Sequence, residues 1–187
     1  MLETVAGQPW EALLTERLFV PLGMTSAGFG VPATPRHIDQ PWGHQRVGAN
    51  NNPMEPGPNA DNPPAIGPAG TVHCSLLDLA KYTAFHLAGH QADTALLPKS
   101  ALRKLHTAVP DNGNYAFGWN ESTRPWAKGP TLSHAGSNVQ WYSVIWIAPN
   151  VDFAVVALSN IAAASGPNPG ATATDQAVAR MIQEFLQ

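Results

Sequence analysis

The amino-acid sequence predicts an α+β domain, in which helices flank an antiparallel sheet. Apolar residues recur with helical spacing near both ends of the chain. Two runs rich in aromatic and β-branched residues, 140–149 and 152–160, are separated by a Pro-Asn turn and are typical of a strand hairpin. Helices on the faces of a sheet built from such hairpins define the α+β class.

Composition limits the class of protein further. The 187 residues are enough for one domain, 1–187, with a real core, and 44% apolar against 12% charged residues indicates a globular chain. A net charge of −3 without a basic run gives nucleic-acid binding no support. Residues 1–11 lack the features of a signal peptide and no run is long enough to span a membrane, so localisation stays open. Cys74 is the single cysteine, which excludes a disulfide within the chain.

The first elements are expected to be helical. Residues 1–6 are typical of the end of a helix, and a second helix is predicted from Pro9, a residue suited to a first turn. Its apolar face has helical spacing: Trp10, Leu13, Leu14 and Leu18. We expect this helix to end before Val20, because Pro21 disfavours helix in the residue that precedes it.

Residues 31–68 are dense in Pro, Gly and Asn without a period, which predicts a rim loop within the domain. A helix is predicted to begin at Ser75, because Ser75 and Asp78 have the spacing of a capping box. We expect this helix to end at Gly89. A shorter helix follows within residues 98–107.

Strands are predicted for residues 115–120 and 131–136, ahead of the hairpin already described. The residues between them are expected to form a solvated loop, to judge from Glu121, Arg124 and Lys128. The chain closes with an amphipathic helix over residues 172–187.

The order of these segments has a resemblance. "LETVAGQPWEALLTERLFVPLGM" (2–24), "GPAGTVHCSLLDLAKY" (67–82), "LSHAGSN" (132–138) and "WIAPNVDFAVVALSN" (146–160) cover nearly all of the chain. Together they resemble the C-terminal portion of the serine β-lactamase and penicillin-binding-protein family, on the side of the class C β-lactamases, D-aminopeptidases and esterases. The resemblance implies an incomplete β-lactamase/transpeptidase-like fold.

That family transfers acyl groups to a serine. A Ser-x-x-Lys motif supplies the nucleophile, a Tyr-x-Asn motif handles a second proton, and a third motif lines the opposite wall of the cleft. "HAGS" stands at the third motif. The resemblance implies that His134 orients substrate or moves protons and that the N–H of Ser137 is an oxyanion donor. Ala135 and Gly136 would lie against the substrate, with Gly136 allowing a close approach.

The first two motifs do not occur in these 187 residues: Ser100 is followed by Arg103 at the lysine position, and no tyrosine has an Asn two residues on. In the family both motifs precede the segment that resembles "LETVAG". We therefore expect a truncated serine hydrolase, acting on a β-lactam, a D-amino-acid peptide or a small ester, that is inactive without its upstream portion. Whether this chain is itself an enzyme stays open. The expected partners are a substrate and either the missing N-terminal portion or a second copy at an open sheet edge.

Two alternatives remain. One is a non-catalytic binding or regulatory pseudo-enzyme that uses the remaining cleft wall. The other is a small metalloprotein, because His86 and His90 are four residues apart and share a helix face. Leu87 follows His86, so the glutamate of a His-Glu-x-x-His motif is absent, and we expect neither a metal nor another cofactor. Ser133 and His134 are neighbours on a predicted strand and would point to opposite faces, which excludes a dyad.

Overall fold

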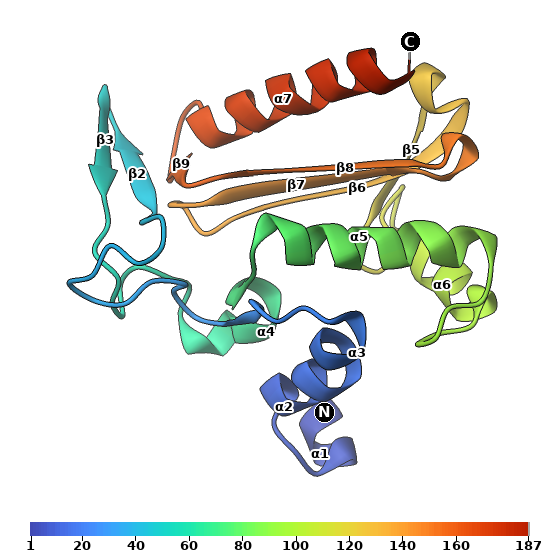
Figure 1. Cartoon of the computed structure of the whole chain (residues 1–187), viewed down its shortest axis with the longest axis horizontal. Helices are drawn as coiled ribbons and strands as arrows, with labels where there is room; N and C mark the ends of the chain where they lie inside the picture. The colour runs from blue at the N-terminus through green and yellow to red at the C-terminus, as the bar shows by residue number, and fades with distance from the viewer. Residues whose placement is uncertain (187) are drawn as a thin grey trace.

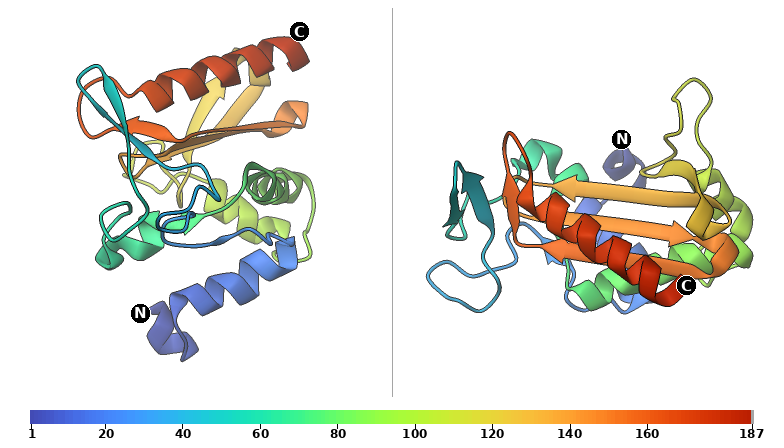
Figure 2. Two further views of the ribbon diagram at one scale, coloured as in Figure 1. Left: turned by 60° about the vertical axis from the view of Figure 1, so that its left-hand side comes forward. Right: turned by 90° about the horizontal axis from the view of Figure 1, so that it is seen from above.

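The computed structural model describes residues 1–186. Its centre is a four-stranded antiparallel sheet in the order β5-β6-β7-β8, with α5 on one face and α7 on the other (Figure 1). These elements are β5 (Asn120–Arg124), β6 (Gly129–Ser137), β7 (Tyr142–Ala148), β8 (Phe153–Ser159), α5 (Leu76–Gln91) and α7 (Pro169–Leu186). The α+β prediction is confirmed, as are strand β6, the hairpin β7-β8 and the closing helix. Seen from above, α7 lies over β7 and β8 (Figure 2).

The register of the sheet sorts its side chains between two cores. Residues directly opposite one another in an antiparallel pair share a face, and Leu132 pairs with Ile147. Both side chains are buried with Trp119 on the face that α5 covers. The alternate residues face α7, where Val144 and its neighbours pack against Val178. The strict alternation of faces along β6 therefore decides which of its side chains can meet a ligand.

The N-terminal helices lie on the side of α5 away from the sheet (Figures 1 and 2). They are α1 (Leu2–Ala6), α2 (Trp10–Leu14), a π-helical turn (Thr15–Phe19) and α3 (Val20–Leu22). The prediction that the helix stops before Val20 is wrong, because it continues through Pro21 to a left-handed Gly23. The wide π turn explains this, since it relieves the clash between a proline ring and the carbonyl of the preceding turn.

The two ends of α5 differ in how well the sequence predicts them. Ser75 is the N-cap, and its Oγ accepts the Asp78 N–H at 3.3 Å, as predicted. The prediction of an end at Gly89 is wrong, because the helix continues to Gln91. Gly89 instead allows α6 (Lys99–His106) to approach, since a Cβ at this position would overlap Leu102 Cδ1.

Strand β5 begins where the sequence predicts a strand to end. Residues 115–120 form a turn around Gly118, whose φ of 89° is left-handed, and only a single bridge joins Tyr115 to Asn120. The predicted strand is therefore wrong. Glu121 and Arg124, expected in a solvated loop, lie in β5 instead.

Segment 31–68 contains a strand hairpin that its Pro-, Gly- and Asn-rich composition did not predict. Strand β2 pairs with β3 and, in parallel, with β9, which places this segment beside the C-terminal part of the chain. The remaining elements are β1 (Gly28–Phe29), β2 (His44–Val47), β3 (Asn50–Pro53), α4 (Gly67–Gly70), β4 (Val72–His73) and β9 (Ile161–Ala163), with 3-10 turns at 64–66, 125–127 and 149–151.

A candidate cleft wall on strand β6

His134 lies near the end of β6 and is exposed. It pairs with Ile145, so its side chain stands on the α5 face of the sheet. Its predecessor on that face, Leu132, is buried, so the covered part of the face ends between the two. The imidazole is therefore presented to solvent at the margin of the core.

The backbone at this end of β6 is also open. Strand β5 pairs only with residues 129–133, so the edge of His134 to Ser137 that faces away from β7 has no partner strand within residues 1–186. A Cβ placed on Gly136 would meet nothing closer than Ser143 Oγ, at 3.7 Å. This part of the strand can therefore bond to an extended ligand through its main chain.

A strained turn holds the end of the strand. Val139 has a φ of 67°, which is rare for a β-branched residue. The hydroxyl of Ser137 accepts the Val139 N–H at 3.1 Å, and Asn138 Oδ1 accepts the N–H of Trp141 at 3.0 Å. These side chains fix the backbone just after Ser137, whose N–H is the expected oxyanion donor.

The rim segment 31–68 anchors this turn from outside. Asn138 Nδ2 donates to Asp61 Oδ1 at 3.1 Å. Gln140, which is 4% exposed, donates through Nε2 to the carbonyl of Asn59 at 3.2 Å. Neither contact is visible in the sequence, because the partners are 77 and 81 residues apart.

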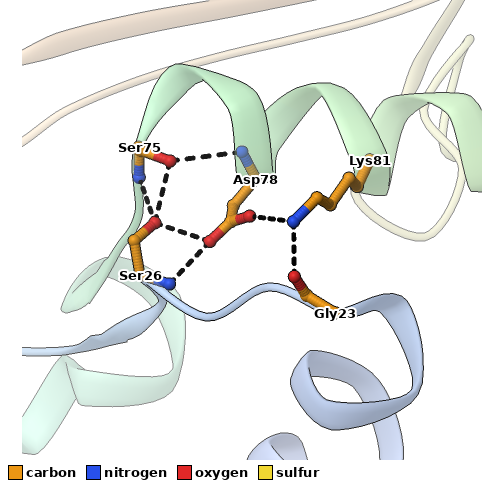
Figure 3. Close-up of polar contacts among 5 residues, drawn as sticks. All are labelled: Gly23, Ser26, Ser75, Asp78 and Lys81. Atoms are coloured by element: carbon orange, nitrogen blue, oxygen red, sulfur yellow. Dashed lines mark hydrogen bonds and ion pairs between the residues drawn. The ribbon is translucent and has the colours of Figure 1, made fainter.

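The tightest polar cluster lies elsewhere, where the turn after α3 meets α5 (Figure 3). Asp78, 3% exposed, accepts from Lys81 Nζ at 2.6 Å, from Ser26 Oγ at 2.6 Å and from the Ser26 N–H at 2.7 Å. The hydrogen bonds from Lys81 and then from Ser26 lower the pKa of Asp78 to about 2. Lys81 also donates to the carbonyl of Gly23. With its ammonium paired in this way, Lys81 cannot act as a base for Ser26, and the cluster anchors α5.

Ser133 and Cys74, the neighbours of His134 and His73 in the sequence, are not activated as nucleophiles. Ser133 pairs with Trp146 on the α7 face, opposite His134, as predicted. Burial, and then the charge of Asp78, raises the pKa of Cys74 to about 11, so its thiol stays protonated at neutral pH. His73 is engaged by the carbonyl of Gly30 at 2.7 Å.

The candidate metal ligands on α5 have a different arrangement. His86 Nδ1 lies 2.8 Å from Nε2 of His106, a residue of α6 that sequence reasoning missed. Both rings are buried. Within residues 1–186, no group of three or more His, Cys, Asp or Glu side chains is placed to hold a metal ion.

A helix-flanked antiparallel sheet with this order of motifs is the fold of the serine β-lactamases and penicillin-binding proteins. The family model described as Beta-lactamase matches residues 1–179, and the chain belongs to this family.

Three relatives illustrate the likeness. Penicillin-binding protein 4 of Amycolatopsis lactamdurans is 25% identical over 169 residues, which cover 86% of this chain and 44% of that protein. The octameric penicillin-binding protein homologue from Pyrococcus abyssi superposes with a TM-score of 0.72 at 23% identity, over 97% of this chain and 39% of that one. The D-amino acid amidase from Ochrobactrum anthropi SV3, complexed with L-phenylalanine amide, gives 0.71 at 17% identity, over 97% and 52%.

The chain thus spans about half the length of these relatives, or less. The likeness supports a serine-hydrolase-like function and leaves the substrate open. Among the described residues, no helix is both long and apolar enough to cross a membrane.

Proposed function

We propose that this chain forms the strand wall of the substrate cleft in a serine hydrolase that transfers acyl groups. The observation that carries the proposal is the exposed His134 beside the open edge of β6, with free space above Gly136. The substrate class is a β-lactam, a D-amino-acid peptide or a small ester.

Each residue of the wall has a proposed role. An extended substrate lies along the β6 edge at Ala135 and Gly136, where the absent side chain of Gly136 admits its backbone. The N–H of Ser137 donates to the oxyanion that forms during acyl transfer. His134 orients the substrate or moves a proton.

The nucleophile comes from outside these 187 residues. Four serines near α5 and β6 have structural roles: Ser26 donates to Asp78, Ser75 caps α5, Ser133 faces α7, and Ser137 accepts the Val139 N–H. We therefore propose that turnover requires a Ser-x-x-Lys and a Tyr-x-Asn segment supplied together with this chain, and that the chain alone is inactive.

The test compares two preparations. The 187-residue chain is assayed alone, and then joined at its N-terminus to the upstream portion of the A. lactamdurans relative. We expect a fluorophosphonate to label no serine of the chain alone, and the joined protein to be labelled and to hydrolyse nitrocefin or a p-nitrophenyl ester. Stoichiometric labelling of the chain alone would overturn the proposal.

The role of the wall needs its own variants in the joined protein. His134→Ala should lower kcat/KM by about 10²-fold, as expected for a group that transfers a proton. Ser133→Ala, a neighbour on the opposite face, is the matched control and should change it little. Equal losses in the two variants would show that the strand is merely fragile.

A non-catalytic binding role for the same wall is the second candidate, favoured by the engaged serines. It predicts that the joined protein binds a β-lactam without hydrolysing it.

For partners, we propose that the outer edge of β8 pairs with an extended segment, from a second copy or from the upstream portion, since β8 ends the sheet among residues 1–186. A concentration-independent monomer in light scattering would exclude the second copy.

A further inference from the structure

A cavity lies away from the cleft wall, between the ends of α5 and α6 and the first half of β6. Its volume is about 140 Å³. It is lined by His90, Arg103, His106, Thr107, Glu121, Pro130, Leu132 and Pro149. A cavity of about 150 Å³ holds benzene, so this one has room for a ligand of about six heavy atoms.

Two ring nitrogens in its wall have no partner. His106 is 5% exposed, and neither its Nδ1 nor the buried Nδ1 of His90 bonds to any group within residues 1–186. Buried polar atoms are rarely left unpaired, because each has lost its bonds to water. The protein therefore leaves two polar atoms for something else to satisfy.

The bond between His86 and His106 limits what that can be. In one arrangement of protons, His86 Nδ1 donates to His106 Nε2, and the remaining proton of His106 sits on Nδ1, the atom without a partner. In the other, His106 Nδ1 has only a lone pair. Burial lowers the pKa of His86 to about 3 and that of His106 to about 4, so both rings are neutral at pH 7. A ligand that accepts hydrogen bonds selects the first arrangement.

Two cations, Lys99 and Arg103, act on His90 at one side of the cavity. Arg103 is exposed and joins neither of the two ion pairs found in residues 1–186. Burial, and then the positive charges of Lys99 and Arg103, lowers the pKa of His90. Glu121 is the one carboxylate in the wall, and its Oε2 already accepts the N–H of Ala108, at 3.4 Å. The positive charges of Lys99 and Arg103 oppose a metal cation beside His90.

We propose that this cavity binds a small oxyanion, the size of phosphate or acetate, through His90, Arg103 and His106. Arg103 supplies the charge and the two imidazoles supply hydrogen bonds, while Leu132 and the prolines exclude water. A bound anion stabilises the protonated form of His90 by charge attraction. Acetate is ionised at both pH values, so its binding is tighter at pH 6 than at pH 8, and it does not depend on the cleft wall.

The test is an NMR titration of the ¹⁵N-labelled chain with inorganic phosphate and, separately, with acetate, at constant ionic strength. We expect saturable shifts of Nδ1 in His90 and His106. Arg103→Met should weaken binding by about tenfold or more, the loss of one charge-assisted hydrogen bond. Lys104→Met is the matched control, because Lys104 is an exposed cation on the same helix but outside the cavity wall.

A saturable response to either anion, weakened by Arg103→Met alone, supports the proposal. Three results would overturn it: no saturable shift with either anion, equal weakening by both variants, or shifts of these nitrogens with zinc chloride but not with the anions. Both substitutions are at exposed positions of α6, so folding is not at risk.

Discussion

Gly89→Ala tests whether the close approach of α5 and α6 is set by a missing side chain. Gly89 lies inside a helix, where alanine is favoured over glycine by about 1 kcal/mol. Helix propensity alone therefore predicts a stabilised protein. Packing predicts the opposite, because the new methyl group would overlap Leu102 Cδ1 and lie 3.3 Å from Thr94 Cγ2.

Packing is expected to dominate. Leu102 is 0% exposed, and protein interiors are packed closely enough that a buried side chain rarely has a void to rotate into. Overpacking of this kind costs about 1–3 kcal/mol. After the gain of about 1 kcal/mol in propensity, the free energy of unfolding should fall by up to about 2 kcal/mol, a large share of the ~5–15 kcal/mol that stabilises a domain.

Urea denaturation followed by tryptophan fluorescence measures this change. Ala88→Gly, at an exposed position of the same helix, is the control and should cost about 1 kcal/mol through propensity alone. Leu102→Ala should cost about 2–5 kcal/mol by itself, and less in the Gly89→Ala background, where the new methyl group fills part of the cavity. A Gly89→Ala protein about 1 kcal/mol more stable than the parent chain, as propensity alone predicts, would refute the reasoning.

Three further outcomes are expected. The free energy of unfolding should fall by roughly 2 kcal/mol or more from pH 7 to pH 5. Histidines of the unfolded chain bind protons with a pKa near 6.5, whereas His86 and His106 stay neutral in the folded protein over this range. A urea midpoint unchanged between pH 7 and pH 5 would contradict this. Cys74 should react slowly with Ellman's reagent at pH 8 and rapidly in urea, and equal rates would mean that the thiol is not protected. Gly170→Ala should cost about 1–3 kcal/mol in the same urea assay, because its Cβ would overlap the carbonyl of Ile161, and an unchanged midpoint would argue against that contact.

Local patterns predicted most of the helices and strands. The capping pair Ser75 and Asp78 marks the start of α5, and the alternating apolar runs mark β7 and β8. The errors have different causes. A π turn carries the first helix through Pro21, a left-handed Gly118 turns residues 115–120, and α5 continues past Gly89. The close contact of Leu102 with Gly89 joins two different helices, and nothing in the local sequence around Gly89 contains that information.

The candidate wall was predicted from its motif, and its roles stay predictions. What the sequence could not provide is the support around it: Asn59 and Asp61 belong to a segment whose composition indicates only a loop. His106 was missed for a similar reason. It lies in a different helix from His86, 20 residues on, so no spacing rule links the two.

The parallel pairing of β2 with β9 has a consequence for the order of folding. His44 and Asn160, which bond beside this pair, are 116 residues apart, so their contact closes a very long loop. The entropy cost of loop closure makes such contacts slow to form. They add little stability until the hairpin β7-β8 has formed. The rim segment 31–68, which carries Asn59 and Asp61, should therefore fold last and unfold first. The sheet can then be folded while the turn at the end of β6 is not yet held by Asn59 and Asp61, so the proposed cleft wall is completed after the sheet.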